Sequence, residues 1–398
     1  MQYRKRGIDS LDLAGKRVFV RADLNVPLDA EGRITDDTRL RAELPTLRAL
    51  RQARARIILA SHLGRPKGRR APSFSLRPVA AYLREALGCP VAFADDCVGP
   101  EAERAAAALR KGDLLLLENL RFHAEEEAND PRFARQLAAL AEVYVNDAFG
   151  TAHRAHASTE GIAKHLRPAL AGPLMQRELE YVTRAFVEPK RPVVALLGGA
   201  KVSDKLGLLR NLLSRVDSLL IGGAMAFTFL AARGVGVGRS LVEPEKLAEA
   251  RALLDLAAHQ GIAILLPEDV AVTEQPSIPA SQRTIVAVAA IPAEAAALDI
   301  GPATCRLFAG VLRDAGTIIW NGPLGKFETP PFDHGTLDIA RAVAASPALS
   351  IAGGGDTASA IHQAGVAERI SFISTGGGAF LELLEGLELP GVAALDDA

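Results

Sequence analysis

The chain has 398 residues, with 46 Lys plus Arg against 47 Asp plus Glu, so its formal net charge is −1 at pH 7. Such a balance gives no reason to expect a nucleic-acid or a membrane partner. Hydrophobic residues make up 49% of the chain and charged residues 23%, which is a globular composition. The length exceeds what one hydrophobic core usually supports, so we expect two domains.

The cysteines and the N-terminal residues indicate a cytoplasmic protein. Cys89, Cys97 and Cys305 are odd in number and form no C-x-x-C pair, so neither a disulfide framework nor a zinc site is expected. Residues 1–10 contain charged side chains and no apolar core, unlike a secretory signal. No stretch approaches the roughly 18 apolar residues that a membrane span needs.

In the first half of the chain, short apolar runs alternate with helical patterns. Leucines at helical spacing predict a helix over 37–53, and a second helix is predicted over 78–87. Strands that are apolar on both faces and separated by helices indicate a parallel sheet covered on both sides. The predicted strands are 17–20, 57–60, 90–93, 114–117 and 143–145.

A charged helical segment then separates two halves of similar size. It runs over 173–188 and is followed by Pro189 and Pro192, so we predict an interdomain helix. The sequence therefore predicts an α/β protein with two Rossmann-like lobes, each a parallel sheet covered by helices, joined by this helix and a hinge. The predicted strands of the second lobe are 193–197, 218–221, 263–266, 317–320, 349–352 and 370–373.

Cationic side chains follow the predicted strands of the first lobe. Ligands of open parallel sheets lie beyond the carboxyl ends of the strands, and arginine binds carboxylate or phosphate through two parallel hydrogen bonds. One such arginine is best explained as a solvated surface residue, but five together predict a site for an acidic small molecule. These arginines are Arg21, Arg39, Arg65, Arg121 and Arg154.

Histidines occur in the same loops, and two explanations for them stay open. His62, His153 and His156 would be either neighbours of a bound phosphate or structural residues. Arg154 stands between two of them, and a cation next to an imidazole disfavours metal binding.

A glycine pair follows the first predicted strand of the second lobe. Lys201 and Lys205 come after Gly199 and are predicted to share one face of a helix at its N-terminus. Lysines oppose the helix dipole there, so a nearby anion would explain them. The alternative is an exposed face with Asp204 as their partner.

Two later glycine runs also open helices. Asp356 and Thr357 follow three glycines, and Asp356 would be either a helix N-cap or a carboxylate near a metal–phosphate complex. The Thr357 hydroxyl would then donate to an oxygen of that complex. Gly376, Gly377 and Gly378 follow the last predicted strand. That turn is either a cradle for a phosphate or a tight strand-to-helix connection.

Eight motifs, taken in this order, resemble the phosphoglycerate kinase family in its bacterial form, and they extend from about residue 18 to 390. The motifs are Val-Arg-Ala-Asp-Leu-Asn-Val-Pro, Ser-His-Leu-Gly-Arg-Pro, Glu-Asn-Leu-Arg-Phe, Asn-Asp-Ala-Phe-Gly-Thr-Ala-His-Arg, Gly-Gly-Ala-Lys-Val-Ser-Asp-Lys, Trp-Asn-Gly-Pro, Gly-Gly-Gly-Asp-Thr and Ser-Thr-Gly-Gly-Gly.

The resemblance implies an enzyme that moves a phosphoryl group reversibly between 1,3-bisphosphoglycerate and MgADP, giving 3-phosphoglycerate and MgATP. Transfer would be direct and in line after hinge closure, with Mg²⁺ as the cofactor, in a monomer. Residues 1–172, completed by about 385–398, would bind the triose. Residues 173–188 would be the interdomain helix, and residues 189–384 would bind the nucleotide.

By motif position, the resemblance also implies roles for individual residues. The triose would be bound by Arg21, Ala22, Asp23, Asn25, Arg39, His62, Leu63, Gly64, Arg65, Arg121 and Arg154. The nucleotide would be bound by Gly199, Lys201, Lys205, Gly222, Asn321, Pro323, Glu328, Gly354, Gly355, Asp356 and Thr357, with Asp356 approaching the metal. The catalytic groups would be Arg39, Lys201, Gly376, Gly377 and Gly378.

A few positions depart from the family pattern. Residues 293–297 read Ala-Glu-Ala-Ala-Ala where Asp-Gly-Trp-X-Gly is expected, so no adenine contact is assigned there. Lys326 replaces a small apolar residue, Phe227 replaces a tyrosine, and Phe380 replaces a serine just after the glycines. None of these changes removes a residue assigned to chemistry.

Two other classes of protein are less well supported. A non-catalytic nucleotide sensor or scaffold of this fold would have lost a cation or Asp356. A nicotinamide dehydrogenase needs a strand followed by G-x-G-x-x-G, whereas Gly234, Gly236 and Gly238 follow a helical segment.

Overall fold

The computed structural model describes residues 4–274 and 283–398, and the chain divides into two compact units. Unit 1 comprises Met1–Glu180 and Glu388–Ala398, and unit 2 comprises Tyr181–Leu387. The division falls inside the helix α6 (Pro173–Phe186), so each unit contains part of that helix.

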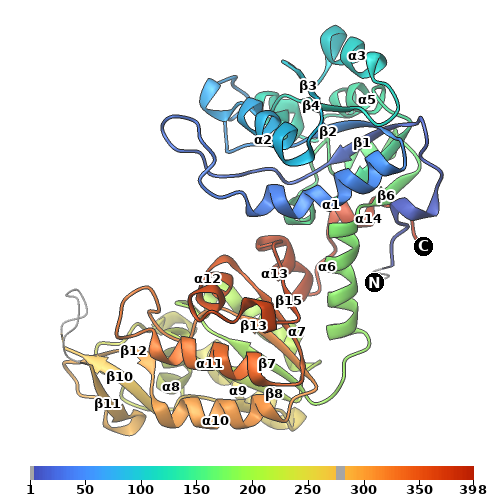
Figure 1. Ribbon diagram of the computed structural model, residues 1–398. Helices are drawn as coiled ribbons and strands as arrows, with labels where there is room; N and C mark the ends of the chain where they lie inside the picture. The colour runs from blue at the N-terminus through green and yellow to red at the C-terminus, as the bar shows by residue number, and fades with distance from the viewer. Residues whose placement is uncertain (1–3, 275–282) are drawn as a thin grey trace. The chain divides into compact units, whose positions relative to one another are not determined.

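Unit 1 is built on a six-stranded parallel sheet with the order β3-β4-β2-β1-β5-β6 (Figure 1). Five of its strands were predicted from apolar runs, whereas β6 contains only three residues and was missed. The strands are β1 (Arg17–Arg21), β2 (Arg56–Ala60), β3 (Val91–Ala94), β4 (Leu114–Leu117), β5 (Val143–Asn146) and β6 (Ala169–Ala171).

Helices cover this sheet because its strands are apolar on both faces. The leucine stripe of α1 packs, together with α2, on the face formed by Val18, Val20, Ile57 and Leu59. On the opposite face, the Phe19 ring lies 6.3 Å from the ring of a tyrosine on β5. The helices of unit 1 before α6 are α1 (Thr38–Gln52), α2 (Arg77–Leu87), α3 (Gly99–Ala108), α4 (Ala124–Glu127) and α5 (Pro131–Ala138).

The C-terminal residues belong to unit 1. The short helix α14 (Pro390–Ala393) lies against the loop after β5, where Gly391 N donates to Ala152 O at 2.8 Å. Lys5 Nζ and Asp397 Oδ1 form an ion pair at 2.7 Å. The two ends of the chain therefore contact each other within this unit.

Unit 2 also contains a six-stranded parallel sheet, with the order β15-β14-β13-β7-β8-β9. Counted along the chain within this sheet, the order is that of a doubly wound dinucleotide-binding fold. The strands are β7 (Val193–Leu197), β8 (Ser218–Ile221), β9 (Ala263–Leu265), β13 (Thr317–Asn321), β14 (Leu349–Gly353) and β15 (Phe372–Ile373).

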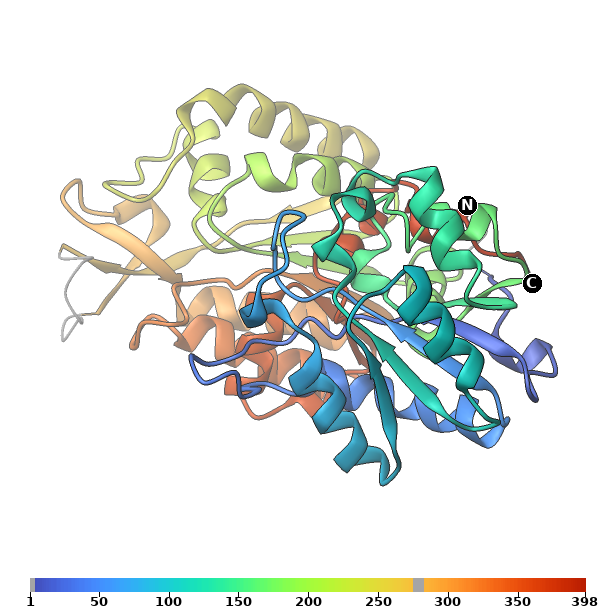
Figure 2. The same cartoon turned by 90° about the horizontal axis from the view of Figure 1, so that it is seen from above.

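Two groups of helices cover the two faces of this sheet (Figure 2). Helices α10 (Pro302–Arg313), α11 (His334–Ala345) and α12 (Gly355–Gln363) pack on one face, in a core that includes Trp320, Phe308 and Ile339. The earlier helices lie on the other side. They are α7 (Leu206–Leu213), α8 (Met225–Ala232) and α9 (Leu247–Gln260), and α13 (Gly378–Leu384) packs against α7.

A small antiparallel sheet in unit 2 was not predicted. It consists of β11 (Thr284–Ala287), β10 (Asp269–Thr273) and β12 (Ala296–Ile300), in that spatial order. The Asp269 carboxylate accepts hydrogen bonds from Ala303 N at 2.9 Å and Thr304 N at 2.7 Å. Since Gly301 at the N-cap of α10 has no side chain, Asp269 satisfies the first N–H groups of that helix. No helix of the described part of the chain is long and apolar enough to cross a bilayer.

Candidate functional site

The candidate residues of each unit lie where the strand order reverses. In unit 1, β1 pairs with β2 on one side and β5 on the other, and in unit 2, β7 lies between β13 and β8. Loops that leave such neighbouring strands diverge to opposite faces, which opens a crevice at the carboxyl ends. The predicted anion-binding loops follow β1, β2, β4 and β5 in unit 1, and β7, β8, β13 and β14 in unit 2.

Arg21 is completely buried and supports the site of unit 1 from behind. Its Nε donates to Ser158 Oγ at 2.8 Å, and its Nη2 donates to His62 Nδ1 at 3.2 Å. Ala22 is also fully buried. This geometry points against the predicted contact between the Arg21 side chain and a ligand.

The two buried histidines of unit 1 are electrically neutral. Burial and the positive charges of Arg21 and Arg121 hold the pKa of His62 well below its ordinary value. Burial and the same two arginines, followed by Arg154, lower the pKa of His156 to about 3. Arg21 and Arg121 act on both imidazoles, so these two arginines lie near both histidines.

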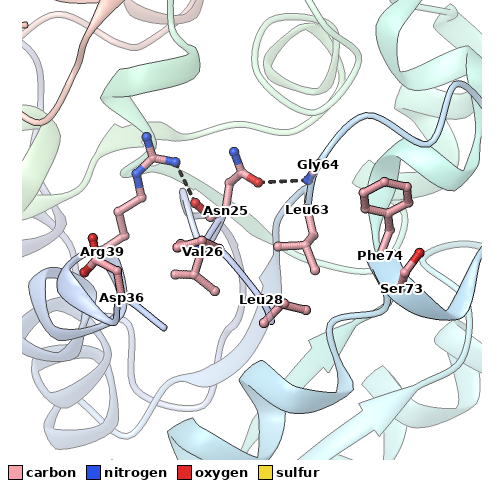
Figure 3. Close-up of a pocket in the computed structure, with 10 residues that line it drawn as sticks. Asn25, Val26, Leu28, Asp36, Arg39, Leu63, Gly64, Ser73 and Phe74 are labelled. Carbon is pink, nitrogen blue, oxygen red and sulfur yellow. Dashed lines mark hydrogen bonds between the residues drawn. The ribbon is translucent and has the colours of Figure 1, made fainter. Parts of the chain in front are cut away.

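Arg39 reaches the same region from α1. Its Nη1 donates to the carbonyl oxygen of Asn25 at 2.8 Å and lies 3.4 Å from Asp23 Oδ1. Asn25 Oδ1 in turn accepts from Gly64 N at 2.8 Å, which ties the loop after β1 to the loop after β2. Figure 3 shows both hydrogen bonds beside the pocket. The Arg39 side chain is 39% exposed, so it remains available to a ligand.

A pocket of about 560 Å³ lies beside Arg39 (Figure 3). Four predicted residues line it, namely Asn25, Arg39, Leu63 and Gly64. Sequence reasoning missed the rest of the lining, because apolar loop residues such as Leu28 and Phe74 carry no chemical signature. The remaining lining residues are Val26, Pro27, Leu28, Asp36, Ser73 and Phe74.

The remaining arginines of unit 1 differ in their surroundings. Arg121 is almost wholly buried, and its Nη1 donates to Gly64 O at 2.9 Å while Nε lies 3.3 Å from Glu127 Oε1. Arg154 is half-buried and donates through Nε to His153 Nε2 at 3.1 Å. Arg65 is exposed.

In unit 2, Lys205 lies in the crevice and Lys201 does not share its helix face. The segment Ser203–Lys205 is a 3-10 turn and α7 begins only at Leu206, so the predicted arrangement of the two lysines on one helical face is wrong. Glu243 accepts hydrogen bonds from Ser203 N and Ser203 Oγ, at 3.1 and 2.6 Å, and holds this turn. Lys201 is exposed, whereas Lys205 points inward.

The Lys205 amine is held by the end of β13. It donates to the carbonyl oxygen of Asn321 at 3.1 Å and to Asn321 Oδ1. Burial lowers the pKa of Lys205 to about 8, although Asp204 and Asp356 act in the opposite direction. Asp356 is therefore close enough to Lys205 to interact electrostatically with it.

Asp356 is not a helix N-cap. It is the second residue of α12, which Gly354 precedes at φ +97° without any side-chain cap. The Asp356 carboxylate is exposed and lies in the first turn. Thr357 is buried, and its Oγ1 accepts from Gly322 N at 2.7 Å, so Thr357 holds two loops together.

The other predicted nucleotide residues follow the strands β7, β8, β13 and β14. Gly199 N donates to Pro323 O at 2.9 Å, and a Cβ on Gly222 would overlap Leu324. Glu328 is exposed on the loop after β13. The glycine turn at 376–378 lies just beyond β15, with Gly377 at φ +52°, and α13 begins at Gly378.

One further cluster of polar side chains lies in unit 1, outside the predicted residues. Donor atoms of Asp96, Cys97 and His123 lie within 4.8 Å of one another. Asp96 Oδ1 is 2.7 Å from both His123 Nε2 and Cys97 N. Hydrogen bonds within the protein therefore account for this cluster.

The depressed pKa of Lys205 can be measured directly. In the ligand-free protein, the ¹³Cε resonance of Lys205 is expected to titrate with a midpoint near pH 8. The folded state then loses this charge as the pH rises through 8, and its affinity for anions falls over the same range. A Lys205→Met variant identifies the resonance. A midpoint near that of an exposed lysine, about 10.4, would contradict the burial argument.

Comparison with known proteins identifies the family. The family model described as "Phosphoglycerate kinase" matches residues 8–387. The chain is 56% identical over 393 residues to a phosphoglycerate kinase of Moorella thermoacetica, covering 99% of both chains. It is 54% identical over 400 residues to a cytosolic phosphoglycerate kinase of Triticum aestivum, again covering 99% of both.

A solved structure shows the same fold. The phosphoglycerate kinase of Coxiella burnetii superimposes with a TM-score of 0.92 at 41% sequence identity, covering 98% of both chains. The chain therefore belongs to the phosphoglycerate kinase family and is a transferase that moves a phosphoryl group reversibly between 1,3-bisphosphoglycerate and ADP.

Proposed function

We propose that unit 1 binds the triose and unit 2 binds the magnesium nucleotide, and that the phosphoryl group passes directly between them. The observation that carries this proposal is the separation of two cationic sites. In unit 1, the charges of Arg21, Arg39 and Arg121 act on His62, and that of Arg154 acts on His156. In unit 2, Lys205 and Asp356 approach each other. Arginine forks suit the carboxylate and phosphate of a triose, and a lysine beside a carboxylate suits a metal-bound phosphate.

In unit 1, residues of the loops after β1, β2, β4 and β5, together with Arg39 of α1, would contact the triose. Arg21 acts differently, because it keeps His62 neutral and oriented rather than touching the substrate. Ala22 and Leu63 are buried and would shape the loops around the substrate. The proposed contacting residues are Asp23, Asn25, Arg39, His62, Gly64, Arg65, Arg121 and Arg154.

In unit 2, residues that follow β7, β8, β13 and β14 would contact the nucleotide. Asp356 fits Mg²⁺, since its carboxylate is exposed in the first turn of α12 and magnesium takes one or two carboxylates together with phosphate oxygens. The ion would neutralise phosphate charge. Asn321 and Thr357 fix the loops. The remaining contacts are assigned to Gly199, Lys201, Lys205, Gly222, Pro323, Glu328, Gly354 and Gly355.

The transfer itself needs positioning and charge stabilisation rather than a protein nucleophile. The bond between the acyl oxygen and phosphorus breaks, the carboxylate leaves, and a β-phosphate oxygen of ADP bonds to phosphorus. Arg39 and Lys201 would neutralise the transferred oxygens, together with N–H groups at Gly376–Gly378. His62 is unsuited as a phosphoryl carrier, because it is buried and Arg21 already donates to its Nδ1.

Closure of the two units around both substrates would exclude water from the transfer. We therefore expect the radius of gyration, measured by small-angle scattering, to decrease when 3-phosphoglycerate and a non-hydrolysable MgATP analogue are added together. Each ligand alone serves as the control. An unchanged radius with both ligands bound would argue against closure.

A coupled assay tests the proposal as a whole. ATP formation from 1,3-bisphosphoglycerate and MgADP is followed, and the metal dependence is tested by chelation. The same preparation, examined by analytical centrifugation, tests the expected monomer. The cytosolic wheat relative supports a cytosolic location for this chain as well.

Replacing Arg39 by alanine is expected to lower kcat by about 100- to 1,000-fold, since one charge-stabilising group is removed from the transferred oxygens. The Kd for MgADP is expected to stay unchanged, because Arg39 lies in unit 1. Arg41→Ala is the matched control, since Arg41 is exposed on the same helix and pairs with Asp37. Loss of MgADP binding with preserved turnover would contradict the division of substrates between the units.

Replacing Asp356 by asparagine keeps the side-chain size but removes the charge. We expect the concentration of Mg²⁺ needed for half-maximal activity to rise about tenfold or more, as one carboxylate ligand is lost. Asp338→Asn is the control, because Asp338 is an exposed residue of α11 that pairs with Arg341. An unaltered magnesium dependence in Asp356→Asn would show that another group holds the ion.

A further inference from the structure

Phe380 is a fully buried aromatic side chain at the start of α13, and the proposed chemistry does not use it. It follows the glycine turn at 376–378 and is the third residue of its helix. A long side chain at such a position lies over the turn before its own Cα. The ring therefore packs close to the turn that is proposed to contact the transferred phosphoryl group.

The Phe380 ring also lies directly on the backbone of Gly353. A Cβ added to Gly353 would overlap two atoms of this ring and lie 3.2 Å from a third, so the contact is possible only because residue 353 is glycine. Gly353 is the last residue of β14, and it is followed by Gly354 and then by α12, whose second residue is Asp356.

The contact continues from Gly353 to the lysine of the crevice. The Gly353 carbonyl accepts from Asn321 Nδ2 at 2.7 Å, and Asn321 in turn accepts from the Lys205 amine. A helix shift that moved the ring would act on Gly353, and through Asn321 on Lys205. No polar atom of Phe380 takes part, so its role can only be steric.

We propose that Phe380 is a positioning residue that couples the 376–378 turn to the Gly353–Asp356 segment, where β14 passes into α12, and thereby sets the geometry of the nucleotide site. This inference rests on the proposed function of unit 2. The family pattern expected serine at this position, which is too small to reach Gly353 in the same way. The coupling is therefore a property of this chain's own side chain.

Two hydrogen bonds hold the segments on either side of the Phe380 ring in place. Asn211 Nδ2 of α7 donates to Leu384 O at 2.6 Å, which holds the end of α13. Ser374 N donates to Ala352 O at 2.8 Å, which holds the strand before the turn. Because α13 and the strand before the turn are both held, removing the ring would leave a cavity that the surrounding structure can only partly fill.

The test compares Phe380→Ala with Phe308→Ala, a matched control that removes an equally buried phenyl ring of unit 2 from the core beneath α10. Both variants are expected to lower Tm. Only Phe380→Ala is expected to raise the Kd for MgADP, by about tenfold, while leaving the Kd for 3-phosphoglycerate unchanged. Phe380→Leu, which keeps most of the volume, is expected to lie between Phe380→Ala and the unmodified chain.

A double-mutant cycle tests the contact itself. Gly353→Ala alone forces a methyl group against the ring and is expected to weaken MgADP binding. Gly353 does not adopt a positive φ, so alanine is acceptable for the backbone. In Gly353→Ala/Phe380→Ala the methyl group enters the vacated space, so the double variant is expected to bind MgADP more tightly than the two single effects predict.

Three results would overturn the inference. In the first, Phe380→Ala and Phe308→Ala change the Kd for MgADP equally. In the second, neither variant changes this Kd. In the third, the effects of Gly353→Ala and Phe380→Ala on MgADP binding are strictly additive. Asp356→Asn, measured in parallel, separates this failure from failure of the proposed function. If Asp356→Asn weakens MgADP binding while Phe380→Ala does not, only the coupling is wrong. If neither variant weakens MgADP binding, the assignment of the nucleotide to unit 2 is contradicted.

Discussion

Backbone carbonyl groups hold the cations of both candidate sites. Arg39, Arg121 and Lys205 each donate to a main-chain oxygen, at 2.8, 2.9 and 3.1 Å. The nearest carboxylates to the two arginines are farther away, at 3.4 and 3.3 Å. A carbonyl orients a cation without cancelling its charge, whereas a close carboxylate would compete with an incoming phosphate. The ends of parallel strands and the turns after them provide such carbonyls at one edge of a sheet.

The buried Glu126 carboxyl and two neutral histidines limit the repulsion among the arginines of unit 1. Arg21 is buried and shares Ser158 with Glu126, whose Oε1 accepts from the serine hydroxyl at 2.5 Å. Burial raises the pKa of Glu126, while Arg21 acts to lower it. Since His62 and His156 are held neutral, they add no further repulsion. Beneath the exposed charges of this site, Arg21 and Glu126 are therefore linked through the same serine hydroxyl.

In unit 2, glycines determine the shape of the loops that carry the site. Gly199, Gly354 and Gly377 adopt positive φ values, which lets the chain turn sharply after a strand. Glycine turns can adopt many backbone conformations, so contacts from other segments have to fix their geometry. Thr357 joins one pair of loops by a hydrogen bond to Gly322 N. The ring of Phe380 joins another pair by packing, and this difference in mechanism is why a hydrophobic residue is found so close to a polar site.

The strands and the main site residues could be predicted because they follow local rules. An apolar run such as Leu114–Leu117 is buried on both faces and can hardly be anything other than a central strand. The edge strand Ala169–Ala171 and the exposed strand Thr284–Ala287 lack that signal and were missed. The shared helical face of Lys201 and Lys205 was wrong, because contacts from Glu243, far along the chain, hold residues 203–205 in a 3-10 turn.

The sequence by itself determined the fold class, the family and the set of residues that carry charge, since apolar periodicity and motif order are written along the chain. Only the tertiary structure decided which of those charges face solvent. Arg21 and Arg39 look alike in sequence, yet Arg21 is enclosed beneath the site and Arg39 is open to the pocket. Burial, and with it pKa and reach, depends on what packs over a side chain. That covering comes from segments more than a hundred residues away, such as the loop that carries Ser158.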